Sequence, residues 1–75
     1  MSIELILTEV FSITDFKIND DLELRRISLW DSMSHMILIM QIEEKFNIEL
    51  SGDEIADLRT VGDIRVALRK RNVNI

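Results

Sequence analysis

The sequence lacks cysteine and proline, and it contains one histidine, one tryptophan, three phenylalanines and no tyrosine. Without cysteine there is no disulfide and no thiolate metal site, and a single histidine cannot build a zinc site of the usual kind. Without proline, nothing in the chain forbids a helix on steric grounds. A β-sandwich would favour aromatic and β-branched runs with glycine and proline turns. These absences favour a compact helical core of Ile, Leu, Met and Val.

The sequence also lacks a long hydrophobic run and a basic N-terminal segment. The longest apolar stretch, Met36 to Met40, is far shorter than the roughly 20 residues that span a bilayer. The first four residues include an acid, Glu4, where a secretion signal has positive charge. We therefore expect a soluble cytoplasmic protein.

Positive charge is scarce over most of the chain, and the net charge is −5. Residues 1–58 contain 13 acidic and 4 basic side chains, whereas residues 59–75 contain 1 acidic and 5 basic side chains. An acidic protein is poorly suited to nucleic acid, whose phosphates need cationic partners. An acidic body instead attracts basic surfaces of partner proteins.

The 75 residues suffice for one domain, in which only about 60% of the unfolded surface can be buried. Helical spacing of apolar residues predicts a first helix over about 2–12, with Ser2 as its N-cap. Its buried stripe comprises Ile3, Ile6, Leu7, Val10 and Phe11.

Residues 13–30 follow neither helical nor strand periodicity for long. Asn19-Asp20-Asp21 is typical of a turn, and Leu22 to Arg26 can form one helical turn. Apolar residues nevertheless recur throughout this segment, which indicates that the loop lies across the core. Connections of this length inside a compact domain are commonly functional.

A second helix is predicted over Ser32 to about Phe46, with Asp31 as N-cap and Asn47 as its left-handed end. Its apolar residues cover more than one stripe, so it is either central or exposes an apolar patch to partners. These residues are Met33, Met36, Ile37, Leu38, Ile39, Met40, Ile42 and Phe46.

Two cap motifs predict two further helices. Ser51 and Glu54 have capping-box spacing and begin a short third helix that buries Ile55 and Leu58. Thr60 and Asp63 begin a fourth, whose C-terminal bases suit the helix dipole. Its inner face is Val61, Ile64, Ala67 and Leu68, and its bases are Arg69, Lys70 and Arg71. The predicted fold is an all-α four-helix bundle, a single domain over 1–75 with a short third helix and a long first loop.

Ser32 is the main candidate for chemistry. It follows the cap residue Asp31, so it lies in the exposed first turn of a helix, beside backbone N–H groups and the positive end of the dipole. A phosphodiester attached there would be stabilised by both. Read from local physics alone, Asp-Ser at a helix start is more often ordinary capping.

Asp31-Ser32-Met33, followed by an apolar helix ending in Ile42-Glu43-Glu44-Lys45-Phe46, resembles the attachment motif and second helix of acyl and peptidyl carrier proteins. Met33 departs mildly from that family's usual leucine. The resemblance continues through Ile48-Glu49-Leu50, Asp53-Glu54-Ile55 and Thr60-Val61-Gly62-Asp63-Ile64, and covers roughly residues 29–68.

The resemblance implies that a phosphopantetheinyl transferase esterifies Ser32 with 4′-phosphopantetheine from coenzyme A. The arm's thiol would then hold an acyl or aminoacyl group for loading and processing enzymes, as in fatty acid or polyketide biosynthesis. The cofactor would supply the sulfur that this chain lacks. We expect a monomer without catalytic residues of its own, and no metal.

The chain departs from fatty-acid carriers on its second helix, where Ser34 and Ile37 stand at positions that are often acidic. Of the matching acids only Asp31, Glu43 and Glu44 remain. The departure indicates more apolar partner recognition and a specialised pathway. Met36, Ile37 and Ile39 are the candidate contacts.

Other residues have two interpretations each. His35 could pair with Ser32 in a small hydrolase, but an exposed or interface histidine is favoured because no acid partner or oxyanion donor is evident. Met33, Met36 and Met40 could line an acyl tunnel, but core packing is favoured. Trp30 is expected to pack the loop onto the bundle. Asn19, Asp20, Asp21 and Glu23 lack the spacing of a calcium loop and are expected to form a solvated turn. The overall alternative is a carrier-like interaction module without the prosthetic group.

Overall fold

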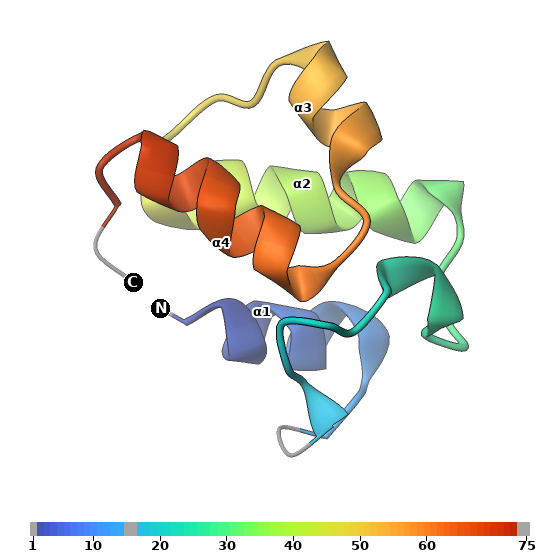
Figure 1. Cartoon of the computed structure of the whole chain (residues 1–75). Coiled ribbons are helices and arrows are strands. Elements are labelled where there is room, and N and C mark those ends of the chain that lie inside the picture. Colours follow the sequence, from blue (N-terminus) through green and yellow to red (C-terminus); the bar gives the residue numbers. More distant parts are fainter. Residues whose placement is uncertain (1, 15–16, 74–75) are drawn as a thin grey trace.

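A computed structural model describes residues 2–14 and 17–73. Its helices are α1 (Ile3–Phe11), α2 (Ser32–Phe46), α3 (Gly52–Asp57) and α4 (Val61–Lys70), with a short 3-10 helix, η2 (Leu24–Arg26), in the first loop. In Figure 1, α2 runs behind α4, with α1 below and α3 above. The prediction of an all-α bundle with a short third helix and a long first loop is confirmed.

The helix ends follow the predicted caps. The Ser2 side chain accepts a hydrogen bond from the Leu5 N–H at 3.1 Å. Ser51 and Thr60 each form a capping box with an acidic residue three positions later. Asn47 ends α2 in the left-handed conformation, with φ of 54°. The helices therefore begin and end where short-range hydrogen bonds direct.

The core brings together buried apolar side chains from α1, α2, α4 and the loops. The predicted inner face of α4 is fully confirmed, whereas Val10 and Ile55, predicted as buried, are only partly so. The largest fully buried side chains are Phe11, Ile3, Ile6, Leu7, Leu24, Leu38, Ile39, Ile42, Ile64, Leu68 and Val61.

The first loop lies across the core, as predicted, and buries Leu24 and Ile27. Its backbone is tied to the start of α4: the Leu24 N–H donates to the Arg59 carbonyl at 2.8 Å, and the Val61 N–H donates to the Leu22 carbonyl at 3.0 Å. These bonds hold η2 against the α3–α4 connection, on the side of the bundle where α2 begins (Figure 1).

A glycine permits this close approach. The Gly62 N–H donates to the Asp20 carbonyl at 2.9 Å, and a Cβ at position 62 would lie 3.1 Å from that same oxygen. A side chain at position 62 would therefore require the Asp20 backbone to shift by a few tenths of an ångström.

Arginine side chains link segments that are distant in the sequence. Arg65 on α4 donates to Glu4 at 2.9 Å and to Asp20 at 2.6 Å. Arg71, assigned to the helix dipole from the sequence, has a further role: it pairs with Glu54 on α3, while its Nη1 also donates to the Ala67 carbonyl at 3.2 Å. None of the helices within the described ranges has the length and apolarity needed to cross a membrane.

Candidate functional site

Ser32 is the first residue of α2 and is exposed, and Asp31 caps the helix as predicted. The Asp31 Oδ1 accepts from the Ser34 N–H at 2.7 Å, while the Asp31 N–H donates to the Ser34 Oγ at 2.8 Å. Sequence reasoning missed this role of Ser34, although the spacing of Asp31 and Ser34 is that of a capping box. The reciprocal bonds fix the turn from which Ser32 projects.

The Ser34 backbone N–H is the main reason that the pKa of Asp31 lies below its ordinary value. Asp31 is therefore ionised at neutral pH and a strong cap. The backbone N–H groups of the first turn of α2, and the positive end of the helix dipole, lie next to the Ser32 hydroxyl. An exposed hydroxyl in this position fits a phosphate ester.

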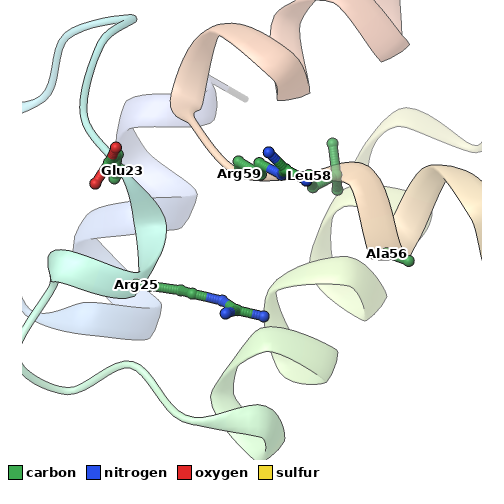
Figure 2. A pocket seen from close by; sticks show the side chains of 5 residues that line it. All are labelled: Glu23, Arg25, Ala56, Leu58 and Arg59. Carbon is green, nitrogen blue, oxygen red and sulfur yellow. The ribbon is translucent and has the colours of Figure 1, made fainter.

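A pocket of about 300 Å³ lies beside Ser32, and its lining includes Arg25, Trp30, His35, Met36, Ile55 and Leu58. A second pocket of about 340 Å³ shares Arg25, Ala56 and Leu58 with the first and extends to Glu23 and Arg59 (Figure 2). A flexible group attached to Ser32 thus has an adjoining surface depression between η2 and α3 in which to lie.

His35 is half-buried and bridges three segments, so of the two expectations, an exposed or an interface histidine, the first is wrong. Its Nδ1 accepts from the Trp30 Nε1–H at 3.2 Å, and its Nε2 lies 3.3 Å from the Ile55 carbonyl. Because the tryptophan N–H can only donate, Nδ1 is the acceptor, so Nε2 carries the ring hydrogen and donates a hydrogen bond to the Ile55 carbonyl.

The contacts of His35 bear on two earlier interpretations. In the described part of the chain the hydrogen bonds of its ring go to Trp30 and Ile55, not to Ser32, which argues against a nucleophile–base pair. Trp30 is half-buried against the core and packs the loop, as predicted.

The methionines of α2 do not pack in the core as predicted, nor do they line an internal tunnel. Met33, Met36 and Met40 are 74%, 48% and 63% exposed, and Ile37 is 44% exposed. Ile39, predicted as a partner contact, is only 1% exposed, so that prediction is wrong. A helix has one inward face, and Leu38, Ile39 and Ile42 occupy it.

Side-chain oxygens of the acidic turn before η2 form hydrogen bonds and ion pairs within the chain. The Asn19 Oδ1 accepts from the Asp21 N–H at 2.9 Å, Asp20 pairs with Arg65, and Glu23 pairs with Arg26 at 2.6 Å. Within residues 2–14 and 17–73 no group of three potential metal ligands is present.

An exposed serine at a capped helix start, beside a pocket in a four-helix bundle, is compatible with a covalently attached prosthetic group. Residues 3–65 match the family described as "Phosphopantetheine attachment site". The chain belongs to this family, and its covalent prosthetic group is 4′-phosphopantetheine.

Several similar proteins are acyl carrier proteins. That of Chlamydia caviae is 46% identical over 41 residues, covering 55% of this chain and 53% of the relative. That of Tropheryma whipplei is 43% identical over 44 residues, covering 59% and 46%. That of Chlamydia felis is 30% identical over 69 residues, covering 92% and 88%. The first two matches span about half the length of those relatives. Acyl carrier proteins are carriers, not catalysts.

Proposed function

We propose that Ser32 is the attachment point of phosphopantetheine and that the chain holds an acyl or aminoacyl intermediate as a thioester on this arm. The position of Ser32 supports the proposal most directly, because its exposed hydroxyl lies in the first turn of α2 beside the pocket. Residues 1–75 would act as one carrier domain.

Each residue of the site has a distinct role in this proposal. Ser32 Oγ loses its proton and attacks the pyrophosphate of coenzyme A, so that the new phosphate ester forms as the pyrophosphate bond breaks and adenosine 3′,5′-bisphosphate leaves. Asp31 and Ser34 hold the first turn, so that the serine is presented outside the helix and accessible to a transferase. The bound group supplies the thiol for thioester chemistry, since the chain has no cysteine.

The partners in this proposal are a phosphopantetheinyl transferase that uses coenzyme A and the enzymes that load and process the cargo. We define the α2 stripe as Met33, Met36, Ile37 and Met40, which are all exposed and follow the helical spacing i, i+3, i+4, i+7. An exposed stripe of this kind supports apolar docking next to Ser32. A cytoplasmic location, a monomeric state, the lack of intrinsic catalysis and a place in fatty acid or polyketide biosynthesis belong to the same proposal.

The intact mass after incubation with coenzyme A and a promiscuous transferase tests the attachment site. We expect one added phosphopantetheine on the parent chain and on Ser28→Ala, which removes a nearby exposed serine, but none on Ser32→Ala. Addition to Ser32→Ala would assign the arm to another residue. No addition to any variant, with the transferase active on a control carrier, would favour a carrier-like interaction module.

A further inference from the structure

The pocket in Figure 2 lies between two parts of the chain, with Arg25 on η2 and Arg59 on the α3–α4 connection. Arg25, Ala56 and Leu58 also line the pocket beside Ser32. A continuous surface therefore leads from the attachment serine to Arg59, which is in the second pocket and not among the residues lining the first.

The two arginines of this pocket bring positive charge to a chain whose net charge is −5. Arg26, Arg65 and Arg71 form ion pairs with carboxylates. Within residues 2–14 and 17–73, neither Arg25 nor Arg59 has a carboxylate partner. Arg25 instead lies 5.3 Å above the Trp30 ring, a cation–π contact that leaves its charge uncompensated.

One carboxylate also lines the pocket. Glu23 is paired with Arg26 at 2.6 Å, so its charge is already partly balanced by a base other than the two arginines. The pocket thus keeps an excess of positive charge next to the apolar side chains of Ala56 and Leu58.

The backbone holds both walls in place. The Arg59 carbonyl accepts from the Leu24 N–H at 2.8 Å, which ties it to the residue before Arg25. The Arg59 N–H donates to the Asp63 carboxylate at 3.0 Å. A ligand entering the pocket would meet a preformed frame, which lowers the cost of binding.

We propose that this pocket binds an anionic end group, a carboxylate, of the cargo attached to the arm on Ser32. The inference rests on the proposed function. Ala56 and Leu58 would contact the methylenes of the cargo, while Arg25 and Arg59 would bind the carboxylate, for which guanidinium groups are well suited. The arm's own phosphate is the other possible anion, but it would be attached at Ser32, outside the pocket that contains Arg59.

The test begins with free probes and the unmodified full chain. Two pantetheine thioethers without phosphate, one ending in a carboxylate and one in the matching primary amide, are titrated while NMR follows the Nε–Hε signals of Arg25, Arg59 and Arg69. Phosphopantetheine without cargo is titrated separately. Arg69 is the control because it is an exposed arginine on α4 that lines neither pocket.

We expect the carboxylate probe to shift the Arg25 and Arg59 signals and not that of Arg69, and to bind about tenfold more tightly than the amide. Arg59→Gln, which retains its backbone bonds, should remove this preference, and Arg69→Gln should not. Equal binding of both probes would overturn the proposal. So would shifts of Arg25 and Arg59 caused by phosphopantetheine but not by the carboxylate probe.

The same carboxylate and amide groups are then attached to Ser32 through the transferase, with mass confirming attachment. If the groups load but the carboxylate does not shift the Arg59 NMR signal more than the amide does, carboxylate binding in the pocket is rejected and the carrier function still stands. Failure to load, with the free carboxylate probe still shifting both arginines, would reject Ser32 as the attachment site and leave the pocket.

Discussion

Glu54 is a surface carboxyl that joins α3 to the end of α4. It accepts from the Arg71 Nη1 at 2.7 Å and from the Ser51 N–H at 3.0 Å. The bond from Arg71 is the main reason that the pKa of Glu54 falls from 4.5 to about 2. The folded protein therefore keeps Glu54 ionised at pH values at which the unfolded chain would protonate it.

The stability contribution of Glu54 should be lost as the pH falls from about 4.5 to about 2, because unfolding takes up a proton in that range. We expect Glu54→Gln to be less stable at pH 7 and to show a weaker pH dependence within that window, measured by urea unfolding. Glu44→Gln, at an exposed position of α2, is the control. An unchanged slope in Glu54→Gln would contradict this interpretation.

At the scale of elements, α2 has an inward face and an exposed stripe that contain equally apolar side chains. Ile39→Ala should destabilise the protein by about 2–5 kcal/mol because it leaves a cavity in the core. Ile37→Ala, which shortens an exposed isoleucine, should change the stability by no more than about 0.5 kcal/mol. Urea unfolding measures both, and equal losses would contradict the assignment of the two faces.

His35 joins the first loop, α2 and α3 through one ring. Replacing it with alanine removes the bonds to Trp30 and Ile55, and should cost about 1–3 kcal/mol at about 0.5–1.5 kcal/mol for each bond. Hydrogen exchange of α3 amides should accelerate in the same variant. Met40→Ala on the exposed side of α2 should do neither, and normal α3 protection in His35→Ala would refute the bridging role.

At the scale of the whole molecule, Arg65 connects α4 to α1 and to the first loop across 61 and 45 residues of sequence. Its side chain is 20% exposed, so solvent screens these pairs only in part. Arg65→Gln should cost about 1–2 kcal/mol, and Arg69→Gln should stay within about 0.5 kcal/mol. Thermal or urea unfolding measures the difference, and similar effects of both changes would show that the network contributes little.

The sequence predicted the fold well where short-range interactions decide it. Ser2, Asp31, Ser51 and Thr60 bond to N–H groups three residues away, so spacing alone locates each helix start. The same cap located Ser32 in the first turn of α2, whereas the proposal that it is the attachment point depended on the resemblance of Asp31-Ser32-Met33 to the motif of carrier proteins.

What the sequence did not reveal depends on contacts between distant residues. The consecutive apolar residues of α2 do not specify which face turns inward. Ile39 was therefore predicted to contact partners and Met33 to pack in the core, whereas Ile39 is buried and Met33 is exposed. The Ile55 carbonyl that His35 contacts is 20 residues away. The clustering of Arg25 and Arg59 likewise required the loop to be placed against α4.

The most direct measurement is the mass and fragmentation of this protein purified from its own cells. The proposed carrier function predicts a phosphopantetheine, with or without cargo, on the peptide that contains Ser32. A cargo retained during purification would also reveal whether it ends in a carboxylate. Unmodified Ser32 in cells whose other carrier proteins bear the arm would contradict the assignment.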